Sequence, residues 1–358
     1  MKKVLIVSTV GLIYDGITSV ITSYLQAMNL EGLDVYVAGT IDVKPSIRKQ
    51  IEDCGCAVVE FPNRRTETFM YFCALTKFVR KNHIDVIHAH GNSGTLAIEM
   101  VAAWLGGCKK RIAHSHNTKC DQVRADKVLR PLFNIFYTDG LACGDSAGQW
   151  LFGNRKFEVL INGRDIEKYK FNLETRNKIR SEHGINDEIV IGHVGGFVEQ
   201  KNHKFLVEIY RELRQLEPNC KLFMIGDGPL KYDIEKLCFD LDVIFTGAID
   251  NIPDYLNAMD GMLLPSLFEG LPLVAIEWQI NGLPCLLSDT ITSDCKLTNI
   301  VEFMSLNNSA REWAQEILKI INSGNRLVDA LNSYRVIYDS KYNIRKAARE
   351  LERIYKYY

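Results

Sequence analysis

Several features that would place the chain in a membrane, on nucleic acid or outside the cell are missing from its 358 residues. No run approaches the roughly 18 consecutive apolar residues that a membrane-spanning helix needs. The 43 lysines and arginines nearly balance the 44 aspartates and glutamates, so the net charge of −1 argues against a nucleic acid partner. Val4–Val7 follows two lysines as in a signal peptide, but the run breaks at Ser8-Thr9 without a small-residue cleavage site, which predicts a first β-strand.

The ten cysteines form no zinc-binding pattern. Cys54 and Cys56 are the only close pair, and C-x-C without a second pair is a poor zinc signal. Cysteines scattered through apolar segments fit a reducing compartment. The expected location is therefore the cytoplasm, including the inner face of the cell membrane.

Common nucleotide-binding motifs are also lacking. There is no G-x-G-x-x-G, so a dinucleotide site is unsupported. Gly11 and Gly16 have the G-x4-G spacing of a P-loop, but Ile17 stands where the phosphate-binding lysine belongs, which makes an NTPase a weak hypothesis.

What the chain does contain is a regular alternation of apolar strand segments and helical segments. This alternation predicts parallel, doubly wound sheets, and 358 residues are enough for two α/β domains. Residues 1–165 carry 20 Lys+Arg against 16 Asp+Glu, a net charge of +4, and the remainder carries 23 against 28, a net charge of −5. The basic first part suits an anionic acceptor or a membrane surface, although scattered solvated charge explains it equally well.

The most informative segment is residues 262–289, MLLPSLFEGLPLVAIEWQINGLPCLLSD. We predict a buried strand at its start and then a helix from Gly270 to about Ile280. The free N–H groups at such a helix start form a site for phosphate. Glu269 and Glu277 frame this start, and carboxylates accept hydrogen bonds from sugar and ribose hydroxyls. The arrangement predicts a nucleotide sugar as ligand; solvated helix charges are the alternative.

The pattern E-G-L-P-x5-E followed by G-L-P in this segment resembles the E-x7-E segment of retaining GT-B glycosyltransferases of family 4. The likeness is greatest to the bacterial exopolysaccharide and capsule branch, and it covers nearly the whole chain. It implies two Rossmann-like parallel-sheet domains facing a cleft. The acceptor side would be residues 1–165, the nucleotide-sugar side residues 187–340, and a final helix, residues 343–358, would cross back to the first domain.

The resemblance also assigns roles to single residues. His116, in His114-Ser115-His116-Asn117, resembles the histidine that contacts the transferred sugar, and Lys201 resembles the lysine that grips the diphosphate. Glu269 would orient the hexose and Glu277 the ribose. The other donor-binding positions that the resemblance implies are Gly16, Gly226, Asp227, Gly270, Leu271 and Pro272.

Two positions depart from the family's pattern. Asp15-Gly16 stands where the family usually has Gly-Gly, and Gly196 occupies the position of an arginine that helps Lys201 to hold the diphosphate. A charge-assisted contact is worth roughly 1.5–3 kcal/mol, or about 10- to 150-fold in affinity or rate. Losing one contact of several weakens an enzyme of this kind rather than abolishing its activity.

Four histidines, His88, His90, His114 and His116, lie within 29 residues and raise the alternative of a metal site. No carboxylate joins them at ligand spacing, and the resemblance implies a reaction that needs neither metal nor cofactor. Asp240-Leu241-Asp242 matches a metal-binding D-x-D, but it precedes a strand rather than following one, so solvated charge is the better interpretation.

Residues 120–138 mix basic and apolar side chains and leave two interpretations open. One is an interfacial patch for a lipid-linked acceptor and peripheral membrane association. The other, which the composition favours, is a helix that faces the core and keeps its basic side in water. In either case Pro131 is expected to interrupt a single helix.

The function that the resemblance implies is transfer of a hexose, with retention, from a nucleoside diphosphate sugar, expected to be UDP-linked. The acceptor would be a glycan or lipid-linked glycan of a surface polysaccharide. Two alternatives stay open. Gly196 motivates a catalytically weakened nucleotide-sugar-binding subunit of a glycosyltransferase complex, and a UDP-sugar epimerase would share the same fold.

Overall fold

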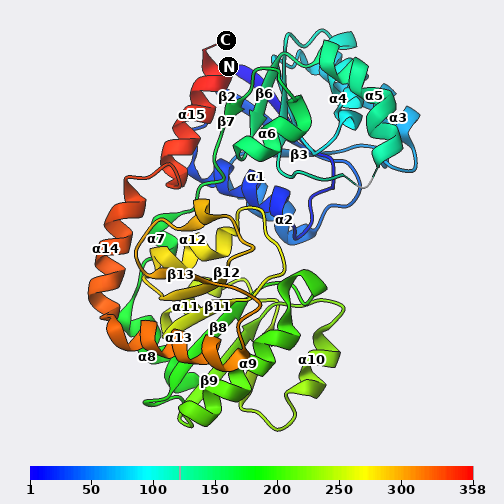
Figure 1. The fold of residues 1–358 in the computed structure, drawn as a ribbon. Coiled ribbons are helices and arrows are strands. Elements are labelled where there is room, and N and C mark those ends of the chain that lie inside the picture. The colour runs from blue at the N-terminus through cyan, green and yellow to red at the C-terminus, as the bar shows by residue number, and fades with distance from the viewer. Residues whose placement is uncertain (121, 358) are drawn as a thin grey trace. The chain divides into compact units, whose positions relative to one another are not determined.

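The computed structural model describes residues 1–120 and 122–357. The chain divides into two compact units (Figure 1). Unit 1 comprises Met1–Asp165 with Lys341–Tyr358, and unit 2 comprises Ile166–Ser340. Each unit is a parallel sheet covered by helices on both faces, which confirms the predicted pair of doubly wound α/β domains.

Unit 1 is built on a seven-stranded sheet in the order β3-β2-β1-β4-β5-β6-β7. Its strands are β1 (Lys2–Ser8), β2 (Leu33–Gly39), β3 (Ala57–Glu60), β4 (Val86–His90), β5 (Lys110–Ser115), β6 (Asp139–Ala142) and β7 (Glu158–Val159). Its helices are α1 (Gly16–Ala27), α2 (Pro45–Asp53), α3 (Thr68–Asn82), α4 (Ala97–Leu105), α5 (Val123–Phe136), α6 (Asp145–Phe152) and α15 (Ile344–Lys356), with a short 3₁₀ turn η1 (Gly94–Leu96).

Strand β1 is buried on both faces, as a parallel sheet between two helical layers requires. Val4 and Ile6 of β1 belong to the core beneath α1 and α15, whereas Leu5 and Val7 belong to the core beneath α3, α4 and α5. Consecutive residues of a strand point to opposite faces, so every position of a strand that is covered on both sides faces a core and is expected to be apolar. This explains the uninterrupted apolar run near the start of the chain.

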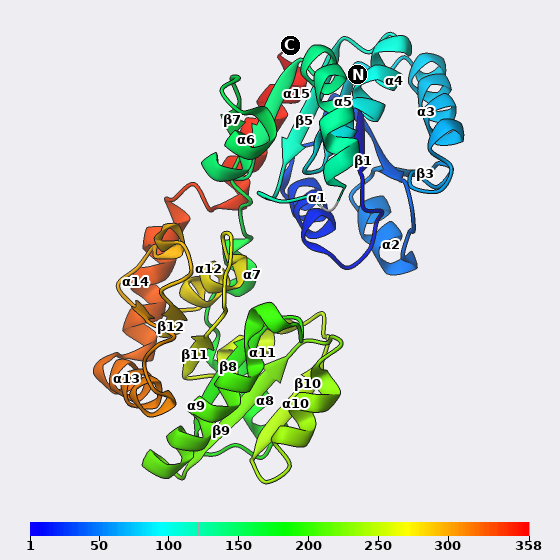
Figure 2. The ribbon, with the colours of Figure 1, turned by 45° about the vertical axis from the view of Figure 1, so that its right-hand side comes forward.

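Unit 2 has a six-stranded parallel sheet in the order β10-β9-β8-β11-β12-β13. Its strands are β8 (Ile189–Val194), β9 (Cys220–Ile225), β10 (Val243–Gly247), β11 (Gly261–Leu264), β12 (Cys285–Ser288) and β13 (Val301–Met304). Its helices are α7 (Ile166–Tyr169), α8 (Leu173–Glu182), α9 (His203–Leu216), α10 (Lys231–Leu237), α11 (Ile252–Ala258), α12 (Leu273–Ile280), α13 (Ala310–Ser323) and α14 (Arg326–Tyr338), with 3₁₀ turns η2 (Glu199–Lys201) and η3 (Ser293–Cys295). Figure 2 shows α9 and α13 side by side, and the two helices are in contact.

The helix α15 returns the chain to unit 1 after the whole of unit 2. Its predicted apolar stripe, Ile344, Ala348, Leu351 and Tyr355, is buried and joins the core of β1 and α1. The backbone enters this helix along the segment that leaves the unit, because the Arg164 N–H donates to the Tyr342 carbonyl at 2.7 Å and the Ile344 N–H donates to the Arg164 carbonyl at 3.0 Å. Only glycine fits at position 163, since a Cβ there would lie 2.6 Å from the Ile344 Cα.

Two predictions about helices are wrong. The helix expected from Gly270 begins instead at Leu273, with Pro272 as its N-cap residue. Residues 123–136 form one helix, α5, in spite of Pro131. Proline removes one hydrogen bond from a helix, and both Pro131 and Lys127, whose carbonyl would have accepted that bond, are exposed, so water can satisfy it.

Helix α5 packs on the core through Phe133, Leu129 and Phe136 and keeps Arg124 and Lys127 in water, as the favoured interpretation expects, but its solvent face also carries apolar side chains. Val128, Leu132 and Ile135 are exposed, and Phe133 is the apolar residue of α5 that is fully buried. Within the described residues, no helix is both long enough and apolar enough to cross a bilayer.

We expect truncation of α15 side chains to destabilise unit 1. Leu351→Ala should lower the free energy of unfolding by about 2–5 kcal/mol, because the buried leucine leaves a cavity among side chains of β1 and α1. Arg349→Ala, at an exposed position of the same helix, is the control and should change it by less than about 0.5 kcal/mol. Urea unfolding measures the free energy of unfolding of both variants. Equal losses in the two would contradict the packing of Leu351 in the core of unit 1.

Candidate functional site

The strand order of each sheet reverses at one point, where the loops after two neighbouring strands diverge. In unit 1 this point lies between β1 and β4, and in unit 2 it lies between β8 and β11. The loops that follow these strands at their carboxyl ends contain most of the residues singled out in the sequence. The two loop clusters are described separately, one for each unit.

The first cluster is an array of four imidazoles on one face of the unit 1 sheet. His88 and His90 alternate along β4, and His114 and His116 alternate along β5 and just beyond it, so all four point the same way. The two strands pair in register with His90 opposite His114. The ring centroids of His88 and His114 are 5.2 Å apart, and those of His90 and His116 are 5.0 Å apart.

Hydrogen bonds connect these rings to one another and to α15. His88 Nδ1 lies 2.6 Å from the Tyr355 hydroxyl, and His88 Nε2 lies 3.1 Å from His114 Nδ1. His90 Nδ1 lies 2.8 Å from His116 Nε2. Each nitrogen pair shares one proton, so the tautomers of neighbouring rings are set together rather than singly.

His116, the predicted sugar contact, is held at two atoms. Its ring nitrogen Nε2 meets His90, and its backbone N–H donates to the Asn92 side-chain oxygen at 2.9 Å. The ring is thus fixed in orientation, and Nδ1 is a buried polar atom without a partner among the described residues.

The array is electrically neutral at ordinary pH. Burial, and then the charge of neighbouring imidazoles, hold the pKa of His88, His90 and His114 well below the usual histidine range. Burial lowers the pKa of His116 to about 3. A neutral imidazole can donate or accept a hydrogen bond but offers no positive charge to a phosphate.

Donor atoms of His88, His90 and His114 lie within 4.8 Å of one another, which is the arrangement that the metal alternative needs. However, both nitrogens of His88 already have hydrogen-bond partners. Hydrogen bonding therefore accounts for the orientation of His88, whereas His114 Nε2 has no partner among the described residues. The expectation that no metal is needed stays a prediction.

Gly16 is the first residue of α1, and its surroundings differ from those of a phosphate loop. The Asp15 carboxylate caps the helix by accepting the Thr18 N–H at 2.8 Å. A carboxylate at a helix N-terminus competes with phosphate for the same N–H groups. A Cβ at Gly16 would meet nothing within 4 Å, so the packing does not require glycine there.

The second cluster, in unit 2, contains Lys201 at the end of η2 and Glu269 in the loop after β11. The Lys201 ammonium lies 2.5 Å from the Glu269 carboxylate, and the side chains are only 15% and 10% exposed. Glu269 also accepts hydrogen bonds from the Ser266 hydroxyl at 3.0 Å and the Gln200 amide at 3.1 Å. The structure thus brings together two predicted site residues that are distant in sequence.

The backbone that follows Glu269 leaves N–H groups exposed to a ligand. Gly270 and Leu271 precede α12 instead of forming its first turn, and Pro272 caps it. Among the described residues, no acceptor meets the N–H groups of Gly270 and Leu271. Such amides remain suited to an anion, even though the helix itself begins at Leu273.

Glu277 lies two turns away from this loop, in the middle of α12. It is 6% exposed. A buried carboxylate on a helix next to the carboxyl edge of the sheet suits a ligand hydroxyl better than it suits solvent. Its predicted contact with a ribose is not tested by this geometry and stays a prediction.

The loop after β9, with Gly226 and Asp227, packs against the loop after β8. Gly226 has a φ of +141°, and a Cβ there would lie 2.1 Å from the Gly195 carbonyl oxygen. The Phe197 N–H donates to the Asp227 carbonyl at 3.0 Å. Gly196, at the tip of the neighbouring loop, is exposed and would place a Cβ no closer than 3.6 Å to any atom, so a side chain at this position has room.

Three further residues, none of them predicted as a site residue, lie at these clusters. His193 lies near the end of β8, with Nδ1 2.9 Å from the Leu263 carbonyl, and His203 stacks on Phe197 with ring centroids 4.2 Å apart. Burial, and then the charge of Lys201, lower the pKa of His203 to about 4. Asn92 positions His116. The sequence feature that could have identified Asn92 is its place in His90-Gly91-Asn92, directly after a strand.

Comparison with known proteins places this geometry in context. The family described as "Glycosyl transferases group 1" matches residues 188–323. The chain is 35% identical to "Putative glycosyltransferase EpsF" of Bacillus subtilis over 259 residues, 67% of this chain and 67% of that protein. It is 26% identical to "UDP-Gal:alpha-D-GlcNAc-diphosphoundecaprenol alpha-1,3-galactosyltransferase" of Escherichia coli over 290 residues, 72% of this chain and 74% of that one.

Among solved structures, the chain is similar to Alr3699/HepE of Anabaena in complex with UDP-glucose. The TM-score is 0.80 at 18% identity, and the alignment covers 99% of both chains. A likeness at this identity shows the fold. This similarity of fold confirms the predicted GT-B class.

We expect the protein to lose stability as the pH falls. His88, His90 and His114 stay neutral when folded, whereas the unfolded chain takes up protons below its histidine pKa of about 6.5. Each such group should lower the free energy of unfolding by about 1.4 kcal/mol per pH unit below that value. The urea midpoint, compared between about pH 7.5 and about pH 5.5, measures the loss.

A pair of variants isolates the contribution of the array. His88→Gln should reduce the pH dependence by the contribution of one group, while His83→Gln, at an exposed histidine of the same unit, should leave it unchanged. A urea midpoint that stays constant across this pH range would refute the neutral array.

Proposed function

The chain belongs to the group 1 glycosyltransferases, and from this we propose that it transfers a hexose from a nucleoside diphosphate sugar, with retention of configuration, to a hydroxyl of a glycan or lipid-linked glycan. The observation that most directly supports this proposal is the Lys201–Glu269 ion pair next to the backbone N–H groups of Gly270 and Leu271, which have no acceptor among the described residues. This loop combines a cation and N–H donors for a diphosphate with a carboxylate for sugar hydroxyls.

UDP is the proposed nucleotide. The name of the E. coli relative specifies UDP-galactose as donor, and the Anabaena protein was solved with UDP-glucose. Surface polysaccharide synthesis is the proposed setting, at the cytoplasmic side of the cell membrane, because the E. coli relative acts on a diphosphoundecaprenol-linked sugar.

In this proposal Lys201 and the two amides neutralise the leaving diphosphate, which is where negative charge grows in the transition state. Donor binding then places the ammonium between the phosphates and Glu269. Glu269, steadied by Ser266, orients the hexose, and Glu277 accepts from the ribose. Gly226 and Asp227 form the loop beside the nucleoside.

In unit 1, His116 is the residue proposed to contact the transferred sugar. Its neutral ring, oriented by His90 and Asn92, offers Nδ1 to a sugar hydroxyl. The leaving phosphate is proposed to take the acceptor proton on the same face of the sugar. A required metal or cofactor has no place in this scheme.

Peripheral membrane association is also part of the proposal. The exposed apolar residues Val128, Leu132 and Ile135 share α5 with Arg124 and Lys127, which are exposed too. An amphipathic helix of this composition lies in the interface of an anionic membrane, with its apolar side chains inserted.

Donor turnover tests the proposed function. The wild-type protein should hydrolyse or transfer from one of UDP-glucose, UDP-galactose and UDP-N-acetylglucosamine, in the presence of a chelator. Lys201→Met should reduce kcat/KM by about 10- to 150-fold, because one charge-assisted contact to the diphosphate is lost. Lys178→Met, at an exposed lysine of the same unit, is the control.

The double variant Lys201→Met/Glu269→Gln separates catalysis from folding. It removes both charges of the pair, so a purely structural defect is relieved while the loss of turnover persists. Nucleotide binding without turnover in the wild-type protein would favour the binding-subunit alternative, and release of free sugar with inverted stereochemistry at one carbon would favour an epimerase.

Gly196→Arg should increase activity. The position is exposed and has room for a side chain, and an added guanidinium can form a bidentate contact with the diphosphate. We expect kcat/KM for the UDP-sugar to rise about 10-fold or more. Gly196→Ala and Gly196→Gln control for backbone stiffening and for side-chain bulk, and an arginine variant no better than these would contradict the assignment.

A further inference from the structure

The loop after β4, residues 91–94, holds His116 in place, because its Asn92 side chain accepts the His116 N–H at 2.9 Å. Whatever holds this loop therefore also determines where the imidazole of His116 lies. One support comes from α6, whose Trp150 indole N–H donates to the Asn92 carbonyl at 2.8 Å. This bond joins neutral groups, and the Trp150 side chain is partly open to water, so its net contribution is modest.

A stronger support comes from α5. The Gly94 N–H donates to the Asp126 carboxylate at 2.6 Å, and both residues are buried. A hydrogen bond to a charged acceptor is roughly twice as strong as one between neutral groups. Burial strengthens it further, because no water competes for the N–H. Of these two supports, Asp126 is the one on which the position of the loop chiefly depends.

The Asp126 carboxylate is itself held by Arg130, one turn further along α5. The Arg130 guanidinium donates to the two carboxylate oxygens at 2.6 and 3.2 Å, and it donates to the Leu151 carbonyl of α6 at 2.7 Å. A buried ion pair is often no more stabilising than apolar side chains of similar volume, so it is weak evidence of a role in stability. What this pair does provide is an acceptor oxygen at a fixed position.

Gly94 brings the backbone of the loop into direct contact with the backbone of α5. A Cβ at this position would lie 2.9 Å from the Arg130 Cα and 3.0 Å from the Asp126 carbonyl oxygen, so only glycine fits. Backbone atoms cannot swing aside as the end of a long side chain can. A shift of α5 at this point is therefore passed on to the loop.

We propose that Asp126 is a positioning residue for sugar transfer. It fixes the loop through the Gly94 N–H, and the loop fixes His116 through the Asn92 side chain. This role rests on the proposed sugar contact of His116 and deepens it, because the accuracy of that contact then depends on a helix outside the histidine array. A displacement of about 1 Å at a group that positions the substrate can reduce turnover about 100-fold.

Amide hydrogen exchange of the full chain tests the positioning without any substrate. Asp126→Ala leaves the Gly94 N–H without its acceptor, so the His116 amide should exchange about 10-fold faster or more, because the loop that carries its own acceptor is released. Asp126→Asn keeps a side-chain oxygen and loses the charge. It should show the same effect at smaller size, and it remains informative where the alanine variant does not fold.

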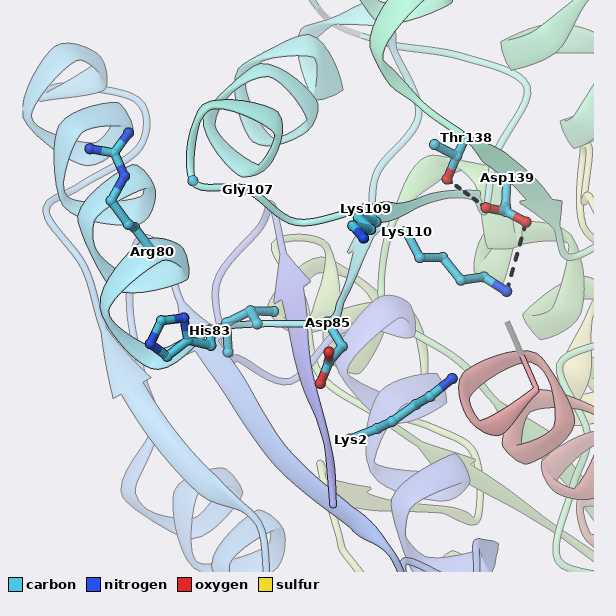
Figure 3. A pocket seen from close by; sticks show the side chains of 11 residues that line it. Lys2, Arg80, His83, Asp85, Gly107, Lys109, Lys110, Thr138 and Asp139 are labelled. Carbon is cyan, nitrogen blue, oxygen red and sulfur yellow. Dashed lines mark hydrogen bonds and ion pairs between the residues drawn. The ribbon is translucent and has the colours of Figure 1, made fainter.

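Asp139→Ala is the matched control. Asp139 is also an ion-paired aspartate of unit 1, 3.8 Å from the Lys110 ammonium, and it accepts the Thr138 hydroxyl (Figure 3). It is the first residue of β6 and so lies at the opposite edge of the sheet from His116. The control should leave the exchange at His116 unchanged. Equal acceleration in the control, or unchanged exchange in both Asp126 variants, would overturn the proposal.

A double-mutant cycle on donor turnover separates positioning from general destabilisation. Asp126→Ala should reduce kcat with the UDP-sugar about 10-fold or more, while the Kd of UDP, which is assigned to unit 2, stays unchanged. In a His116→Ala background the same substitution should cost less than about 2-fold, because the group that Asp126 positions is gone.

The outcomes of this cycle distinguish Asp126 from the function itself. An equal reduction of kcat in both backgrounds would make Asp126 a structural residue and overturn the proposal. A wild-type protein without turnover of any UDP-sugar would refute the proposed function instead. Hydrogen exchange at His116 would then still decide whether Asp126 positions that residue.

Discussion

Every strand in both sheets runs parallel to its neighbours, and this single direction determines where chemistry can occur. Parallel strands bring all their carboxyl ends to one edge, and the reversal of strand order opens a gap between loops there. The histidine array, the Lys201–Glu269 pair and the glycine loops after β8 and β9 all lie at such edges. The opposite edge of unit 1 receives the strand beginnings, and its lysines gather there for the same reason.

The two clusters accommodate polar side chains that are removed from water in different ways. In unit 1, burial suppresses charge, and neutral imidazoles pair through hydrogen bonds, while Nε2 of His114 and Nδ1 of His116 have no partner among the described residues. In unit 2, a lysine and a glutamate side chain lie in direct contact with each other. The first arrangement is suited to recognising hydroxyl groups by orientation, and the second is suited to exchanging one anionic partner for another when a phosphate arrives.

Residue patterns were sufficient to predict elements that depend on local periodicity. The alternation of strands and helices and the stripe of Ile344, Ala348, Leu351 and Tyr355 are found as expected, because burial repeats with the period of the element. The pairing of Lys201 with Glu269 could not be predicted from spacing, since it depends on β8 and β11 being neighbours in the sheet. The two interpretations of α5 stayed open for a related reason: the periodicity of its apolar residues is the same whether they face the core or solvent.

The hydrogen bond between Tyr355 and His88 joins residues that are 267 positions apart in the sequence and are therefore synthesised at well-separated times. The strands of unit 1 emerge first, but the face of the sheet that carries the array is covered by α15, which emerges only after all of unit 2. Unit 2, whose contacts are contiguous in the chain, can fold as it is made, as domains generally do. Unit 1 cannot complete its core until α15 has been synthesised, so the histidine array is the last part of the protein to form.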